Sequence, residues 1–167
     1  MFILYPHCIF HRIYDIPADY FREKGITTLL LDIDNTLTGD NDPIPNARAL
    51  EWLEMQHQAG MRLMVLSNNY ERRVRPFAES LGLEYIAEAK KPLPGNLKKA
   101  LTTLGVRMGE TAVIGDQIFT DILCARLAGC LAVLVEPIAL ENYGFYRVKR
   151  LLEIPVLRGA RRRLKSE

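Results

Sequence analysis

Short uninterrupted hydrophobic runs alternate along the chain with segments whose hydrophobic residues recur at helical spacing. The runs have the length of β-strands and lack strict alternation with polar residues, which is typical of parallel strands buried on both faces. The pattern therefore predicts five parallel strands. They occupy residues 26–33, 61–67, 84–89, 111–115 and 130–135.

Amphipathic segments follow the first four of these runs, and we expect each of them to be a helix. Asn46 is a suitable N-cap for the first helix and Gly60 a suitable stop, whereas Pro76 either weakens the middle of the second or marks a late start. Strands that alternate with helices indicate an α/β fold with a doubly wound parallel sheet and a Rossmann-like core. The four predicted helices span residues 46–60, 70–82, 94–105 and 118–129.

The pattern weakens after Pro137. We expect a helix at about residues 141–153, a break at Pro155 and a basic terminal helix, because proline disrupts a helix interior. The 167 residues match one typical domain. The expected organisation is therefore a single domain over residues 1–167, with a short apolar N-terminal segment and a basic tail at about 148–167.

Composition favours a cytoplasmic protein. No apolar run reaches the roughly 18 residues of a membrane span, and the first residues lack the charged leader and cleavage site of a signal peptide. The three cysteines include no C-x-x-C pair, so neither a disulfide framework nor a zinc site is expected. His7, Cys8 and His11 allow two interpretations, a metal half-site or a local packing segment.

Charge is distributed unevenly along the chain. Residues 148–167 hold seven lysines and arginines against two glutamates, whereas the whole chain carries only +2. A basic tail on a mildly acidic body indicates a polyanionic partner. An anionic membrane surface would place the protein peripherally at the membrane. RNA or a ribosomal particle is the alternative, and a solvated helix with no target is the third interpretation.

Polar side chains gather where four of the predicted strands end. In open α/β sheets, ligands bind at the carboxyl ends of the strands. Each cluster alone is compatible with ordinary turn chemistry, but the four together indicate one site. The clusters are Asp32-Ile33-Asp34-Asn35-Thr36, Ser67-Asn68-Asn69, Lys90-Lys91-Pro92, and Gly115-Asp116-Gln117 with Thr120 and Asp121 just beyond.

The residue types in these clusters suit phosphoryl transfer. Three carboxylates close together, those of Asp32, Asp34 and Asp116, repel one another and need a cation, and an all-oxygen set suits Mg²⁺. The hydroxyl group of Ser67 with nearby backbone N–H groups, and the charge of Lys91, can hold phosphoryl oxygens. A carboxylate can also act as a nucleophile and form an aspartyl-phosphate.

Four motifs in this order resemble the haloacid-dehalogenase superfamily of phosphatases. They are D-x-D-x-T after an apolar strand, Ser67 at the end of the second strand, Lys-Pro, and G-D-x-x-x-x-D, and they span residues 32–121. The resemblance implies that Asp32 is the nucleophile. It implies that Asp34 protonates the leaving group and then activates water, while its backbone carbonyl binds Mg²⁺.

The same resemblance implies roles for the remaining site residues. Ser67 would hydrogen-bond the transferred phosphoryl group with Asn68 beside it, and Lys91, rather than Lys90, would stabilise the nucleophile and the intermediate. Asp116 would complete the metal site. Thr36, Gly115 and Asp121 would support it, Gly115 because a missing side chain allows close backbone approach.

The second aspartate and the motif spacing narrow the reaction. Superfamily members that act as dehalogenases or phosphonatases typically lack an acid at the position of Asp34, whereas the alkoxide leaving group of a phosphate ester needs a proton. The intervals 34–67 and 69–91 leave no room for a cap domain, so the site resembles the open, capless class III members. Residues 1–136 further resemble the YqeG-like subclass IIIA proteins, which are similar to mitochondrial-type phosphatidylglycerophosphate phosphatases. That resemblance implies a lipid-head-group phosphate as a candidate substrate.

Other functions and substrates stay open at the level of sequence. A scaffold that binds RNA or a ribosome through the basic tail is one alternative, and a phosphatase for a soluble small ester is another. A receiver domain would carry its phosphorylated aspartate at the end of the third strand, where this chain has Glu88 and Ala89. The sequence does not define the oligomeric state; a partner subunit covering the open site is one option.

Overall fold

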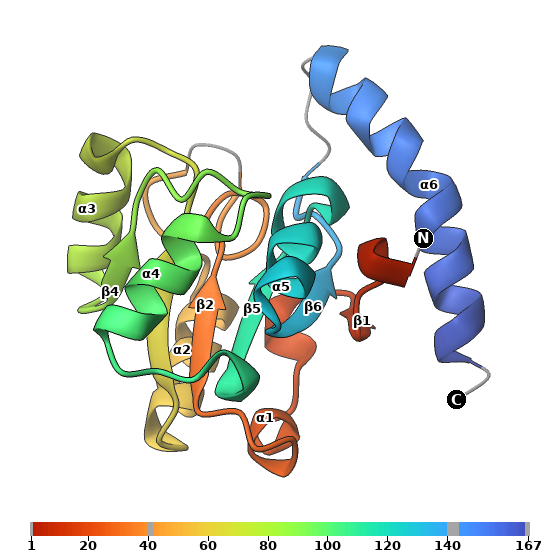
Figure 1. Ribbon diagram of the computed structural model, residues 1–167. Helices are drawn as coiled ribbons and strands as arrows, with labels where there is room; N and C mark the ends of the chain where they lie inside the picture. The colour runs from red at the N-terminus through yellow and green to blue at the C-terminus, as the bar shows by residue number, and fades with distance from the viewer. Residues whose placement is uncertain (1, 40–41, 140–143, 166–167) are drawn as a thin grey trace.

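The computed structural model describes residues 2–39, 42–139 and 144–165, and it contains a six-stranded sheet (Figure 1). Every neighbouring pair of strands is parallel, in the order β1-β6-β5-β2-β3-β4. The predicted doubly wound parallel sheet is therefore confirmed. The strands are β1 Cys8–Phe10, β2 Thr28–Leu31, β3 Arg62–Leu66, β4 Glu84–Ile86, β5 Thr111–Gly115 and β6 Leu131–Val135.

Helices cover both faces of this sheet (Figure 1). Those on one face share a hydrophobic core that includes Phe21, Trp52 and Phe77, and those on the other share a second core that includes Leu97 and Leu101. The first group is α1 Tyr20–Glu23, α2 Ala47–Gln58 and α3 Glu71–Ser80. The second is α4 Gly95–Thr103, α5 Leu123–Ala128 with the preceding π-helical turn η4 Ile118–Ile122, and α6 Gly144–Leu164. Three short 3₁₀ turns complete the elements: η1 Phe2–Leu4, η2 Ile13–Asp15 and η3 Met108–Glu110.

Strand β2 explains why the hydrophobic runs do not alternate with polar residues. Leu29 and Leu31 face the core of the first group of helices, whereas Leu30 faces the core of the second. All three leucines are fully buried. A strand that is covered on both sides has no solvent-exposed face, so an apolar residue is favoured at every position.

The N-terminal segment contains an edge strand that the sequence did not predict. Strand β1 pairs with β6, and His7 Nδ1 accepts a hydrogen bond from Ala132 N at 2.8 Å. His11 Nδ1 lies 2.7 Å from Glu136 Oε2. Among the described residues, the group of side chains that could hold a metal includes neither histidine nor Cys8. The hydrogen bonds of His7 and His11 fit the packing interpretation of this segment.

Helix α6 corrects the prediction of a break at Pro155, because it continues through that residue to Leu164. Pro155 is exposed, so the carbonyl group that loses its helical hydrogen bond lies where water can solvate it. The opposite side of the helix packs against the protein through Val156, Leu157 and Ala160. This packing offsets the missing hydrogen bond. Of the helix predicted at about 141–153, residues 141–143 lie outside the described residues.

No cap domain is present in the described residues. The segment after β2 leads into α2, and the segment after β3 leads directly into α3 (Figure 1). Neither connection carries an inserted domain in the described residues, as the motif spacing predicted. Among the helices that the structure describes, none has both the length and the apolar composition needed to cross a bilayer.

Candidate active site

The central strands bring the predicted site residues to one edge of the sheet. The chain leaves β2 toward β3 on one side, and β5 returns on the other, so the switch in strand order lies between β2 and β5. Asp32 directly follows β2 and donates its backbone N–H to Ile114 O of β5 at 3.0 Å. Asp116 directly follows β5. This crevice is where open α/β sheets bind ligands.

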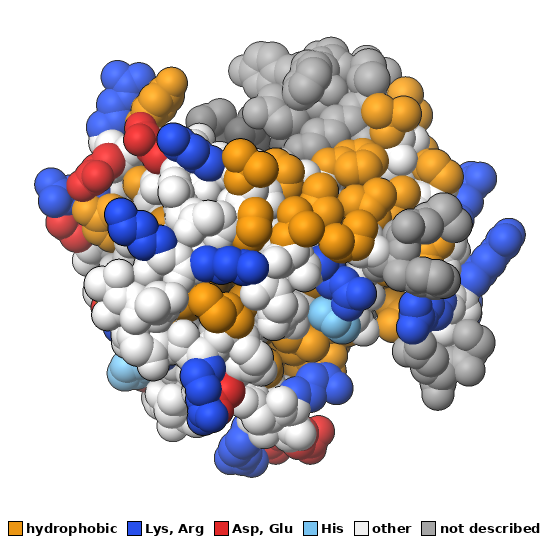
Figure 2. All heavy atoms as spheres, viewed as in Figure 1, with side chains coloured by type: hydrophobic (Ala, Val, Ile, Leu, Met, Phe, Trp, Pro, Cys, Tyr) orange, Lys and Arg blue, Asp and Glu red, His pale blue; other side chains and the backbone are white. Residues whose placement is uncertain are grey.

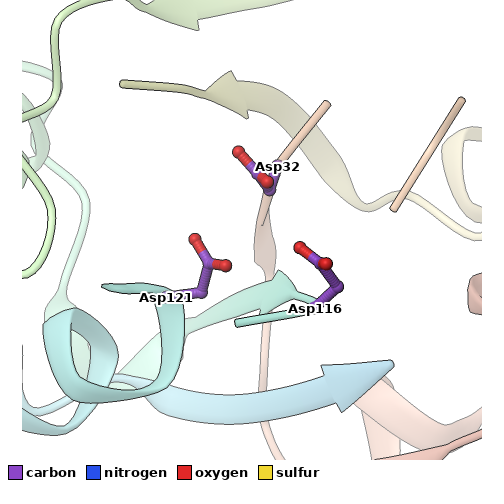
Figure 3. Close-up of side chains that lie close together, drawn as sticks. All are labelled: Asp32, Asp116 and Asp121. Atoms are coloured by element: carbon purple, nitrogen blue, oxygen red, sulfur yellow. The ribbon is translucent and has the colours of Figure 1, made fainter. Parts of the chain in front are cut away.

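Three aspartate side chains converge in this crevice. One carboxylate oxygen from each of Asp32, Asp116 and Asp121 lies within 4.8 Å of the other two. Figure 3 shows these carboxyl groups pointing toward one another from the end of β2, the end of β5 and the turn η4. Asp116 and Asp121 are buried. Buried like charges at this separation need a cation, and the oxygen ligands fit Mg²⁺.

The cluster differs in one member from the three carboxylates, Asp32, Asp34 and Asp116, that the residue types led us to expect together. Asp121, which was predicted to support the site, contributes a carboxyl group, whereas the carboxyl group of Asp34 lies outside the cluster. Strand geometry explains the difference. Asp34 is two residues beyond Asp32, where the chain has left β2, and its side chain turns toward α3.

Lys91 is the cation inside this cluster. Its Nζ lies 2.7 Å from Asp32 Oδ1, 2.6 Å from Asp121 Oδ1 and 2.9 Å from Leu66 O. Burial alone would lower the pKa of Lys91, but the carboxylates of Asp121 and Asp32 outweigh burial and raise it, so the lysine stays charged. Lys90, the alternative in the sequence, is exposed.

Burial raises the pKa of Asp32 to about 7. The charge of Lys91 acts in the opposite direction, and the neighbouring carboxyl groups of Asp121 and Asp34 add to the effect of burial. Desolvation penalises the ionised form of a carboxyl group, which explains the direction. Asp32 therefore combines a strongly raised pKa with a position at the centre of the site, as candidate catalytic groups often do.

Ser67 and Asn68 follow β3 and lie beside Lys91. Ser67 is buried, and its Oγ accepts a hydrogen bond from Asn69 N at 3.1 Å. The side chain of Asn68 forms two bonds with the backbone of Lys91, donating to its carbonyl oxygen at 2.9 Å and accepting from its N–H at 2.7 Å. Asn68 therefore positions Lys91, a role that is separate from the substrate contact predicted for it.

The carboxyl group of Asp34 is held by Asn69, a member of the predicted polar cluster with no role assigned to it, and by Arg73, which the sequence did not mark as a site residue. Asn69 Nδ2 donates to Asp34 Oδ2 at 2.6 Å, and Arg73 Nη2 donates to Asp34 Oδ1 at 2.7 Å. Asn69 precedes Tyr70, the N-cap residue of α3, and Arg73 lies in the first turn of that helix. The available signal was their position in and just after the second polar cluster, at the carboxyl end of β3.

Gly115 makes room for Asp121. A Cβ atom at residue 115 would overlap the carboxyl group of Asp121. The same carboxyl group accepts a hydrogen bond from Gln117 N at 3.1 Å. The close approach that we expected at Gly115 is therefore made by a side chain rather than by backbone.

Thr36 is buried within the turn that follows β2. Its Oγ1 has no hydrogen-bond partner among the described residues. The backbone before it turns through Asn35, whose φ of +60° is one that asparagine tolerates better than most residues. Thr36 therefore contributes to the packing of this loop, and its predicted supporting role stays a prediction.

Glu153 of α6 lies outside the carboxylate cluster but binds the turn η4 that carries Asp121. Its side chain is buried, and Oε1 accepts hydrogen bonds from Ile118 N at 2.8 Å and from Phe119 N at 3.4 Å. A carboxylate at the start of a helical turn satisfies N–H groups that have no partner within the helix. Because η4 carries Asp121, Glu153 fixes the turn that places one member of the carboxylate cluster.

The fold and these motif residues define the class of the protein, a phosphatase of the haloacid-dehalogenase superfamily. A family model described as Mitochondrial PGP phosphatase matches residues 2–139. The chain therefore belongs to that family.

Relatives agree with this class. The chain is 32% identical over 152 residues to "Probable phosphatase YqeG" of Bacillus subtilis (strain 168), covering 91% of this chain and 88% of the relative. It is 26% identical to "Phosphatidylglycerophosphate phosphatase 1, chloroplastic/mitochondrial" of Arabidopsis thaliana, covering 92% of this chain but 47% of that longer protein.

Solved structures share the fold at low sequence identity. D,D-heptose 1.7-bisphosphate phosphatase from B. bronchiseptica has a TM-score of 0.55 at 18% identity, over 65% of this chain and 80% of that chain. The deoxy-D-mannose-octulosonate 8-phosphate phosphatase of Haemophilus influenzae has a TM-score of 0.53 at 20% identity, over 67% and 69%. These similarities support the fold alone.

Proposed function

We propose that this phosphatase hydrolyses phosphate monoesters with Mg²⁺ through an aspartyl-phosphate on Asp32. The observation that carries the proposal is the buried cluster in which Lys91 Nζ lies 2.7 Å from Asp32 and 2.6 Å from Asp121, with Asp116 beside them. Lys91 offsets part of the negative charge. A bound cation would offset the rest and stabilise an incoming phosphate.

In the first step, an oxygen of Asp32 attacks phosphorus, and the bond from phosphorus to the ester oxygen breaks. Asp34 in its acid form gives its proton to the departing alkoxide. In the second step, Asp34 takes a proton from water, the resulting hydroxide attacks phosphorus, and the bond to Asp32 breaks to release inorganic phosphate.

The surrounding residues hold the phosphoryl group during both steps. Ser67 Oγ and Lys91 Nζ are the donors for its oxygens, and Asn68 keeps Lys91 in place. Mg²⁺, held by Asp32, Asp116 and the carbonyl group of Asp34, would neutralise charge on the phosphoryl oxygens. Asp121 would orient Lys91 beside this set.

A phosphate-release assay tests the proposed chemistry. Purified protein is incubated with Mg²⁺ and a panel of phosphomonoesters, with Asp32→Asn as the control. We expect release by the wild type, none by Asp32→Asn, and a phosphoenzyme that hydroxylamine cleaves. A wild type that releases phosphate from no ester refutes the proposal. Equal rates of phosphate release by the wild type and Asp32→Asn refute the role of Asp32 as the nucleophile.

For the substrate, we propose a phosphate on a lipid head group. The family and the plant relative point to phosphatidylglycerophosphate, and the edge of the sheet that carries the site is open. Figure 2 shows hydrophobic side chains gathered on the face that carries α4 and α5. Leu93, two residues after Lys91, is 65% exposed, and Leu151 and Leu152, which precede Glu153 on α6, are 64% and 60% exposed.

The outer side of α6 supports binding at an anionic bilayer. Leu151, Leu152 and Ile154 are exposed in the turns next to Glu153, and exposed arginines follow further along the helix. Each basic residue near an anionic surface contributes about 1 kcal/mol, and the leucines add the burial of apolar area. Arg161 is already paired with Glu136 at 2.5 Å, so it contributes less.

Vesicle sedimentation and phosphate release distinguish a lipid substrate from a soluble ester, and membrane binding from RNA binding. We expect binding to phosphatidylglycerol vesicles that weakens with salt and in Leu151→Ser/Leu152→Ser, but not in Leu50→Ser, an exposed leucine on α2. Preference for a small soluble ester over phosphatidylglycerophosphate in micelles contradicts the lipid substrate. A salt-sensitive RNA complex without vesicle binding favours the RNA alternative.

A further inference from the structure

Arg73 is a cation at the site that the proposed steps do not use. Its Nη2 donates to Asp34 Oδ1 at 2.7 Å and lies 3.4 Å from the carbonyl oxygen of Asp42. Its Nε is buried and has no hydrogen-bond partner among the described residues. A buried N–H group without a partner costs free energy. The guanidinium group therefore has donor capacity that the structure leaves unused.

The contacts of Asp34 limit how it can meet a substrate. One carboxylate oxygen accepts from Asn69 and the other from Arg73. To protonate a leaving oxygen, Asp34 must approach it within about 3 Å. Each carboxylate oxygen has two acceptor positions, so a leaving oxygen that reaches Asp34 Oδ1 lies next to the guanidinium group that is bonded to the same oxygen.

Arg73 is the partner of Asp34 that a substrate can also reach. Its side chain is 25% exposed and that of Asp34 is 26% exposed, so both reach the open edge of the site. If the leaving oxygen comes within about 3 Å of Asp34 Oδ1, Nη2 is at most about 6 Å from it, because Nη2 lies 2.7 Å from the same Oδ1. The substituent of the leaving oxygen therefore lies within reach of the guanidinium group.

We propose that Arg73 is a specificity-determining residue that binds a second anionic group on the leaving-group side of the phosphate ester. Binding of that group exchanges the bond from Arg73 to Asp34 for a bond from Arg73 to substrate and frees the Asp34 carboxyl group. The inference rests on the proposed role of Asp34. Carboxylates and phosphodiesters share the chemistry that a planar guanidinium fork recognises.

Two matched pairs of substrates distinguish these sources of negative charge. Phosphoglycolate carries a carboxylate that 2-hydroxyethyl phosphate replaces with a hydroxymethyl group. Glycerophosphoglycerophosphate carries a phosphodiester that glycerol 3-phosphate lacks. In the wild type, we expect a lower KM for the charged member of at least one pair, and the pair that shows it identifies the anion.

Substitutions of Arg73 test its contribution. Arg73→Gln should raise KM for the preferred charged ester at least tenfold and change KM for its neutral partner less than threefold, with Arg73→Lys between them. Arg72→Gln is the matched control, because Arg72 is exposed on the same helix and lies over the ring of Tyr70 at 5.7 Å. It should leave both constants unchanged.

Binding to an inactive protein gives a readout that does not require turnover. In the Asp32→Asn background, Arg73→Gln should weaken binding of the charged ester at least tenfold by calorimetry. Equal losses for charged and neutral esters, or no loss, overturn the proposal while the phosphatase chemistry stands. If the wild type turns over no ester, the proposed function fails first, and the binding comparison still decides the role of Arg73.

Discussion

Replacing Gly115 by alanine adds a methyl group where the structure already holds the carboxyl group of Asp121. Asp121 must then move. It would give up its bond to Lys91 Nζ at 2.6 Å and its bond from Gln117 N at 3.1 Å. The substitution therefore tests whether glycine is required at this position to make room for Asp121.

The size of the effect follows from these contacts. Overpacking a filled site costs about 1–3 kcal/mol, and a lost hydrogen bond to a charged group costs about 1.5–3 kcal/mol. Lys91 keeps its bond to Asp32 and the chain relaxes in part. We therefore expect a loss of about 3 kcal/mol in the free energy of unfolding. Phosphate release should fall about 100-fold, because small displacements of catalytic groups carry costs of that order.

Urea unfolding followed by the fluorescence of the single tryptophan, Trp52, measures the stability. Gly109→Ala is the control, since a Cβ there meets nothing within 4 Å; its stability should stay within about 0.5 kcal/mol of the wild type. A Gly115→Ala protein with wild-type stability and activity would refute the reasoning. Reduced stability with unchanged activity would show that the position of Asp121 does not matter for catalysis.

Three further predictions concern charge and support at the site. Burial raises the pKa of Asp32 to about 7, so without metal the folded chain holds a proton that the unfolded chain releases near pH 4. Stability in EDTA should fall from about pH 4 to about pH 7 in urea unfolding, and Asp32→Asn should lack this decline. EDTA should abolish phosphate release and Mg²⁺ restore it, with Asp116→Asn needing at least tenfold more Mg²⁺ for half-maximal rate; full activity in EDTA contradicts the metal site. Glu153→Ala should lose about 2–3 kcal/mol in urea unfolding, because two N–H groups lose their acceptor. Glu153→Gln keeps an oxygen there and should lose less.

The sheet could be predicted because its signals are local. Leu29, Leu30 and Leu31 are consecutive because both faces of β2 are covered, and a continuous apolar run records that directly. The positions of Asp32 and Asp116 follow from the strands that precede them. Parallel strands bring their carboxyl ends to one edge, so the meeting of these residues could be deduced without side-chain geometry.

The missed features depend on contacts between distant segments. Strand β1 has only three residues and is recognisable only through its pairing with β6. Pro155 predicts a break when read locally, but packing of the opposite side of α6 keeps the helix intact. Arg73 and Glu153 look like ordinary charged helix residues. Their partners, Asp34 and the N–H of Ile118, stand 39 and 35 positions away along the chain.

The hydrogen bond from Ile118 to Glu153 links the motif region to a residue that lies outside it. The family match ends at residue 139, whereas Glu153 lies beyond it on α6. A protein could therefore share all four motifs with this chain and still hold the Asp121 turn differently. Exchanging C-terminal helices between such relatives would alter the rigidity of the metal-binding turn while leaving every motif residue unchanged.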